Sequence, residues 1–233
     1  MHHFGSDAEL RSFREQAMAA VSPESAPADA QRVWRDLTEG RASILDAATT
    51  AECSYLVTTR AVLHLPLSQR SQRILERVLA GDCPKHVAAD FDNIALSTLT
   101  CVLKQALARL GSDTHPSKAP LGLVALLHAA RASSGHPRVY SSSARLLGVA
   151  CDVHLTPLPS LSHLLPRAVA DVVLLHAAGK THSEIAALRG RSTRTVANQL
   201  ATAFQRLGYS GRMSMLEFLF SQGEDSRKWN HAG

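Results

Sequence analysis

The sequence predicts a mainly α-helical protein: two tandem four-helix domains of the helix-turn-helix type, each preceded by a small β-hairpin-like element. Three observations lead to this fold class. Two segments of the chain resemble each other, apolar residues recur in both at the spacing of an α-helix, and capping and turn residues stand where such helices would begin and end.

An internal repeat aligns residues 67–111 with residues 165–208. In each copy an apolar helix runs into a glycine, Gly81 or Gly179, and glycine commonly ends helices in the left-handed conformation. A Val-Ala or Ile-Ala pair follows six residues later, and then come a short turn and a helix that ends at a Leu-Gly pair. Each copy therefore predicts three short helices, followed by a fourth at 121–131 in the first copy and at 212–221 in the second.

Local signals in the second copy favour helix-turn-helix geometry. Thr181 and Glu184 form the pattern of a capping box that opens the second helix. Gly190 supplies the turn, and Ser192 can cap the third helix. The first copy holds an Asp-Asn pair at residues 92–93 in its turn, and both residue types tolerate left-handed conformations.

The third helix of the second copy, within residues 192–208, has two contrasting faces. Apolar residues at three- and four-residue spacing predict a core face: Val196, Leu200, Ala203, Phe204 and Leu207. The opposite side carries Arg194, Ala197, Asn198 and Ala201. Small residues there allow close approach to a flat partner, and the amide can both donate and accept hydrogen bonds. Such a face suits a groove.

The chain divides into four parts by pattern and composition. An N-terminal segment, 1–30, is expected to be partly disordered, and a tail, 223–233, to be flexible. Residues 31–131 hold a β-hairpin and a degenerate helix-turn-helix unit, with a loop at 111–120 between helices. Residues 132–222 hold a short β element and the second helix-turn-helix. Runs around 44 and 55–58, and a comparable pair at 139–141 and 146–153, predict the β elements.

Composition bounds the class of protein. The 233 residues are 45% hydrophobic and 19% charged, as in ordinary globular proteins, and the net charge of +5 weakly indicates an anionic partner. Four widely separated cysteines predict free, buried thiols in a reducing, cytoplasmic setting. The spacing of the histidines predicts no metal site, and we expect no cofactor. No apolar run approaches the ~20 residues that a membrane span needs, so we expect no membrane association.

The second copy resembles the DNA-binding domain of LuxR/GerE-type bacterial transcription regulators. The resemblance spans about 60 residues, in the family's order and spacing, and rests on Leu174-Leu175, Ala178-Gly179, Ser183-Glu184-Ile185-Ala186, Ser192, Thr195-Val196, Leu207-Gly208 and Arg212. The first copy is similar to the same family more faintly, through Leu67, Ala80-Gly81, Val87-Ala88, Thr98-Leu99 and Leu110-Gly111. The resemblance implies a third helix that lies in the DNA major groove and a fourth that often forms a dimer contact.

Carried over to this chain, the resemblance implies three sets of site residues. Those directed at base edges are Arg194, Ala197, Asn198 and Ala201. Those near phosphates are Lys180, His182, Ser192, Thr195, Gln199 and Arg206. Arg189 and Arg191, which cluster beside the turn, are added to this set. The dimer contact would use Met215, Leu216, Leu219 and Phe220, whose apolar pattern equally allows the fourth helix to close its own domain. An Asn amide can pair bidentately with adenine, and an Arg guanidinium with guanine. The chain departs from the family at Ala197 and Gln199, where a basic residue and a histidine are common.

The two copies differ in charge. Between Gly179 and Leu207 five basic residues face one acid, a net charge of +4, whereas between Gly81 and Leu110 three basic residues face three acids. Because phosphate neutralisation supplies most of the non-specific affinity for DNA, the second copy is the better candidate for DNA binding.

These observations favour a bacterial, cytoplasmic, DNA-binding transcription regulator. Its partners would be double-stranded DNA, a second copy in a homodimer, and RNA polymerase or another regulator as further candidates. The first unit would serve dimerisation, stability or partner docking. An alternative is an interaction protein that kept the fold without binding DNA tightly, and a sigma-factor-like protein is a third possibility. No Gly-rich phosphate loop, nucleophile motif or paired carboxylates indicate an enzyme, so we expect none.

Overall fold

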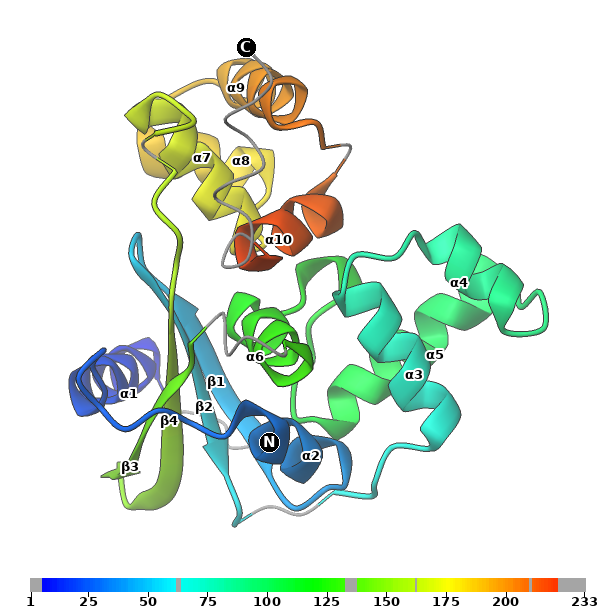
Figure 1. Ribbon diagram of the computed structural model, residues 1–233. Coiled ribbons are helices and arrows are strands. Elements are labelled where there is room, and N and C mark those ends of the chain that lie inside the picture. The colour runs from blue at the N-terminus through cyan, green and yellow to red at the C-terminus, as the bar shows by residue number, and fades with distance from the viewer. Residues whose placement is uncertain (1–5, 62–63, 133–137, 162, 210, 222–233) are drawn as a thin grey trace.

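Two β-hairpins, one preceding each copy of the repeat, join into one antiparallel sheet in the computed structural model of the protein (Figure 1). The strands are β1 (Ser43–Thr49), β2 (Cys53–Thr59), β3 (Tyr140–Leu146) and β4 (Val149–Pro157), in the order β1-β2-β4-β3. The hairpins meet where β2 pairs with β4, from Cys53 opposite Pro157 to Thr58 opposite Asp152. The structure describes residues 6–61, 64–132, 138–161, 163–209 and 211–221.

The helices follow the repeat. The first unit holds α2 (Ala30–Thr38), α3 (Gln69–Leu79), α4 (Pro84–Asp90), α5 (Leu96–Arg109), the 3-10 turn η1 (Pro116–Lys118) and α6 (Leu121–Arg131). The second unit holds α7 (Arg167–Ala177), α8 (His182–Arg189), α9 (Thr193–Leu207) and α10 (Arg212–Ser221). Helix α1 (Asp7–Ala20) precedes both units. The fourth helices, α6 and α10, have the bounds that the repeat predicts.

Helix α6 is the centre of the protein. Its residues from Leu121 to Leu127 are all buried, and it contacts β1, β2 and β4 on one face of the sheet as well as α2, α3 and α10. Gly122 permits this close packing, because a Cβ atom at this position would lie 3.0 Å from the carbonyl oxygen of Tyr55 in β2. Figure 1 shows the consequence: α3, α4 and α5 extend to one side of α6, and α7 to α10 lie at one end of the sheet.

The opposite face of the sheet is covered by α1. Phe13 and Ala17 are buried there against Val57, Val153 and Leu155. Along their strands these three residues alternate with residues that face α6 on the other side of the sheet. Arg14 also joins this helix to β1, through a bidentate ion pair with Asp46 at 2.7 and 2.8 Å. The expectation of a partly disordered segment at 1–30 therefore missed a packed helix. Contacts of its apolar face with the rest of the protein stabilise such a helix more than its own composition does.

The expected fold class is corrected in its layout. The protein is mixed α and β rather than two separate, mainly helical domains, because the two β elements share one sheet. A lone hairpin would leave unpaired backbone groups on β2 or β4, and pairing these two strands satisfies those groups and leaves β1 and β3 at the edges of the sheet. Both predicted hairpins are present, but the second is placed differently from the patterns at 139–141 and 146–153: its turn lies at Leu147 and Gly148, inside the run expected to form the second strand, and its strands are Tyr140–Leu146 and Val149–Pro157. The expected tail at 223–233 lies outside the described residues.

The predicted local signals are confirmed in the structure. Gly81 and Gly179 follow their helices with φ of 109° and 86°, and Gly190 ends α8 with φ of 60°. Asp92 and Asn93 adopt φ of 63° and 50° in the turn before α5. These are the left-handed conformations that the repeat predicts.

The cysteines are free, as predicted, but not all buried. Cys151 is buried and Cys53 half-buried, whereas Cys83 and Cys101 are exposed. Cys83 precedes α4 at its N-cap position, and Cys101 lies on the outer side of α5, away from the core residues Leu99 and Leu103. Two of the four thiols therefore face solvent.

A buried histidine of β4 forms hydrogen bonds to both neighbouring strands, β2 and β3. The ring of His154 lies 2.6 Å from Ser141 Oγ through Nδ1 and 3.0 Å from Thr58 Oγ1 through Nε2, and its side chain is 5% exposed. Burial lowers the pKa of His154 from 6.5 to about 4, although the nearby charge of Asp152 acts in the opposite direction. The imidazole is therefore neutral at pH 7 and links three strands by hydrogen bonds.

Acidification should destabilise the protein through this residue. Between pH 6.5 and 4 the unfolded chain binds the proton and the folded chain does not, so stability is lost as the pH falls, by up to about 3 kcal/mol for His154. Urea denaturation at a series of pH values measures this loss. A His154→Asn variant should show a shallower dependence, with further contributions from His128, whose pKa burial also lowers to about 4, and from His176, whose pKa burial lowers as well. Equal slopes in the two proteins would contradict the assignment.

Candidate nucleic-acid interface

Helices α8 and α9 form a helix-turn-helix whose ends are capped by side chains. The capping box at α8 is confirmed: Glu184 N donates to Thr181 Oγ1 at 3.3 Å, and Thr181 N donates to the Glu184 carboxylate at 2.7 Å. Ser192 Oγ accepts from Thr195 N at 3.1 Å and so starts α9. Between them Gly190 turns the chain, and both helices pack against each other and against α7. The motif is therefore rigidly built.

The core face predicted for α9 is confirmed. Val196, Leu200, Ala203 and Leu207 are buried, and Phe204 is half-buried against the same core. On the other side Arg194, Asn198 and Ala201 are exposed and Ala197 is half-buried. Residues at this three- and four-residue spacing share one helix face. The structure thus brings together all four side chains that the resemblance assigns to base edges, on one side of α9.

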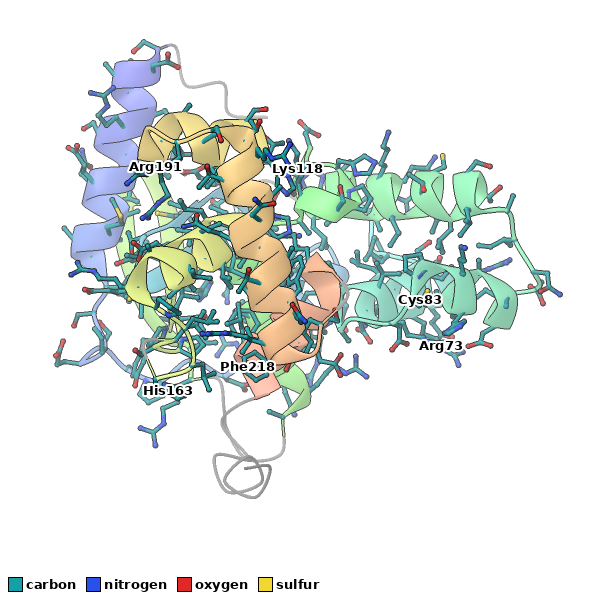
Figure 2. All side chains as sticks on the ribbon, turned by 90° about the horizontal axis from the view of Figure 1, so that it is seen from above. Arg73, Cys83, Lys118, His163, Arg191 and Phe218 are labelled. Atoms are coloured by element: carbon teal, nitrogen blue, oxygen red, sulfur yellow. The ribbon has the colours of Figure 1, made fainter. Side chains whose placement is uncertain are left out.

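The residues expected near phosphates surround this face. Those that the structure exposes are Lys180, His182, Arg191, Ser192, Thr195 and Arg206, and Gln199 is half-buried. Figure 2 looks onto this side of the molecule, where Arg191 lies beside the helix-turn-helix. Arg191, Arg194 and Arg206 form no ion pair within the described part of the chain. Their charges are therefore open to an anionic partner.

Arg189 differs from the other expected phosphate contacts. Its Nη1 atom lies 2.8 Å from Asp171 Oδ2 in α7, and its side chain is 27% exposed. The guanidinium therefore joins the end of α8 to α7 and is already paired with a carboxylate. Sequence reasoning missed this pairing because Asp171 lies 18 residues earlier, outside the motif that carried the expectation.

The side chains of α10 that the resemblance assigns to a dimer contact lie in the core of the chain. Met215, Leu216, Leu219 and Phe220 are at most 3% exposed, within the same core as α6. The ring centroids of Phe220 and His128 of α6 are 5.7 Å apart. The apolar surface that the sequence assigns to a second copy is therefore covered within the chain, because the first unit supplies a helix that packs on it.

Arg212, the first residue of α10, bonds the two units together. It donates to the carbonyl oxygens of His176 and Ala177 at the end of α7, with its shortest bond 2.7 Å long. It also donates to those of Ser117 and Ala119 in the first unit, at 2.9 and 2.8 Å. Burial lowers its pKa to about 10, so the guanidinium remains charged at pH 7. Cations stabilise the carbonyl ends of helices such as α7.

The first unit offers a different surface. The outer side of α5 exposes Cys101, Lys104 and Gln105. All three acids between Gly81 and Leu110 form ion pairs: Arg77 of α3 lies 2.6 Å from both Asp82 and Asp90, and Arg70 lies 3.3 Å from Asp92. Lys85, Lys104 and Arg109 form no ion pair in the part of the chain that the structure describes, so the two copies differ in net charge, zero against +4, and not in the presence of unpaired cations.

A cleft of about 910 Å³ lies between β1 and α7. Ala47, Ala48, Leu174 and Leu175 are among its apolar lining, and Lys118 and Lys180 among its cations. No three His, Cys, Asp or Glu side chains gather as a possible metal site in the ranges that the structure covers. The cleft therefore separates the sheet from the helix-turn-helix without the donor set of a metal centre.

Comparison of the chain with protein-family models, with curated proteins and with solved structures finds no match. None of the helices within the described ranges combines the length and the apolarity that crossing a bilayer requires.

Replacing Arg212 by Met should lower the free energy of unfolding by about 3 kcal/mol, because four carbonyl groups lose a charged donor in a buried setting. Urea denaturation at pH 7 measures the change. Arg206→Met provides the control, since Arg206 is exposed on α9 and its substitution should change stability by less than about 0.5 kcal/mol. Equal effects of the two substitutions would contradict the role of Arg212.

Proposed function

We propose that the protein is a sequence-specific DNA-binding transcription regulator, similar to the LuxR/GerE type, which reads DNA with α9. The observation that carries this proposal is the exposed face of α9, where Arg194 and Asn198 stand one turn apart beside the small residues Ala197 and Ala201. The side chains of Arg194 and Asn198 can each form two hydrogen bonds with the edge of a base, and the small neighbours allow the helix to approach the floor of the major groove.

The charges around this face support the proposal. Lys180, Arg191 and Arg206 are exposed on the flanks of the motif, and Glu184 is the only acid between Gly179 and Leu207. Glu184 is also occupied by Thr181 in the capping box. Phosphate contacts of this kind position a recognition helix and give affinity, while base contacts give specificity.

In this proposal the first unit stabilises the reading unit. Helix α6 covers the apolar face of α10, and the loop before α6 accepts two of the hydrogen bonds of Arg212. The surface of α5 remains exposed in the same protein. It is the candidate docking surface for RNA polymerase or for another regulator in the cytoplasm of a bacterium.

The alternative function is that of an interaction protein without tight DNA binding. Two observations favour it. Ala197 and Gln199 stand where a basic residue and a histidine are common in the family, and Leu96 on α5 is 45% exposed. Salt dependence separates the two proposals. DNA affinity should fall steeply as the salt concentration rises, whereas a partner complex that forms equally at all salt concentrations, without DNA, would favour the alternative.

Removing charge from the helix-turn-helix should weaken DNA binding, and removing it from α4 and α5 of the first unit should not. We expect Arg191→Ala with Arg194→Ala to reduce affinity for a selected duplex by at least about tenfold, from one lost phosphate contact and one lost base contact. Fluorescence anisotropy at several salt concentrations measures the affinity. The matched control removes the same charge by Lys85→Ala with Lys104→Ala. Equal losses would contradict the assignment of DNA binding to α9.

One chain should bind one site. Because α10 is covered by α6, the homodimer expected from the sequence would lack its apolar contact. We expect sedimentation of the protein with a selected duplex to give a complex of one chain, and the selected motif to lack two-fold symmetry. Two chains on a palindromic site would instead restore the homodimer and require a contact surface other than α10.

A further inference from the structure

Lys118 of the first unit lies against the helix-turn-helix of the second. A Cβ atom on Gly179, the residue that ends α7, would be 3.6 Å from both the Cα and the carbonyl oxygen of Lys118. The two positions are 61 residues apart in the sequence. In Figure 2, which views the molecule from the side of α9, Lys118 is seen next to the helix-turn-helix. The connection between α5 and α6 thus reaches the start of α8.

The charge of Lys118 acts on the same place. The pKa of the Glu184 carboxyl is lowered, first by its hydrogen bonds to Thr181 and in addition by the positive charges of Lys118 and Lys180. Both lysines therefore lie close to the first turn of α8. Both are exposed, and neither forms an ion pair in the part of the chain that the structure describes.

The backbone on either side of Lys118 is held firmly. Arg212 donates to the carbonyl oxygen of Ser117 at 2.9 Å and to that of Ala119 at 2.8 Å. Pro116 and Ala119 are buried, so the short turn η1 is anchored on both sides while the lysine side chain faces solvent. Such a cation is presented at a fixed place relative to α8 and α9.

We propose that Lys118 contacts a backbone phosphate of the DNA bound by α9, next to the phosphate contacted by Lys180. This inference rests on the proposed function, because it assigns a further residue to the same interface. It also gives the first unit a direct part in DNA binding, through the loop between its third and fourth helices rather than through α5. Arg189 is paired with Asp171, and Lys118 supplies an unpaired charge to the same side of the motif.

The test compares Lys118→Ala with Lys104→Ala, which removes the same charge from an exposed site on α5. A lost phosphate contact should reduce the slope of log affinity against log salt by about 0.9, which is about an eightfold loss at 0.1 M relative to 1 M salt. The loss should be equal on a selected duplex and on random-sequence duplex, because phosphates carry no sequence information. Lys118→Arg should retain the slope.

Three outcomes separate the inference from the function on which it rests. The expected result is a reduced slope for Lys118→Ala alone, with its melting temperature unchanged. If Lys118→Ala matches Lys104→Ala while Arg191→Ala with Arg194→Ala loses binding, the inference fails and the proposed function stands. If the unsubstituted protein shows no salt-dependent affinity for duplex DNA, the proposed function fails, and the inference fails with it.

Discussion

The half-buried guanidinium of Arg212 joins the two halves of the protein. It is the point at which the end of α7, the start of α10 and the loop before α6 share one set of hydrogen bonds. A charged group is costly to remove from water unless its donors are satisfied. Arg212 therefore stabilises only the arrangement in which all these carbonyls converge, and this requirement selects one docking geometry for the two units.

Burial of α6 has a second consequence for the organisation of the chain. One side of this helix packs on the sheet and another receives α10, so the helix serves both units at once. The two copies of the repeat are therefore related in sequence and local structure but not interchangeable in position. The first copy has no net charge between Gly81 and Leu110, while the copy at the end of the sheet has a net charge of +4 between Gly179 and Leu207, around an exposed helix.

The features that the sequence predicted correctly are those that depend on residues close together in the chain. Helix ends at Gly81, Gly179 and Gly190, the capping box at Thr181 and the bounds of α6 and α10 depend on residues within a few positions of one another. The two faces of α9 follow from its period in the same way. Pairing of β2 with β4, packing of α1 and the ion pair of Arg189 depend instead on distant partners, and apolar periodicity shows that a surface is buried without showing what covers it. For this reason the apolar pattern of α10 leaves open whether a second chain or its own chain covers the helix.

The pairing of β2 with β4 also bears on how the chain is made. About 100 residues separate Thr59 from the end of β4, which at about 5–20 residues per second takes a ribosome roughly 5 to 20 s. During that time the newly made β2 has no neighbour on the side that β4 will occupy. An open strand edge of this kind pairs readily with the same strand of another nascent chain. The order of synthesis therefore creates an interval in which β2 can pair with a neighbouring nascent chain on the same messenger RNA instead of with β4 of its own chain.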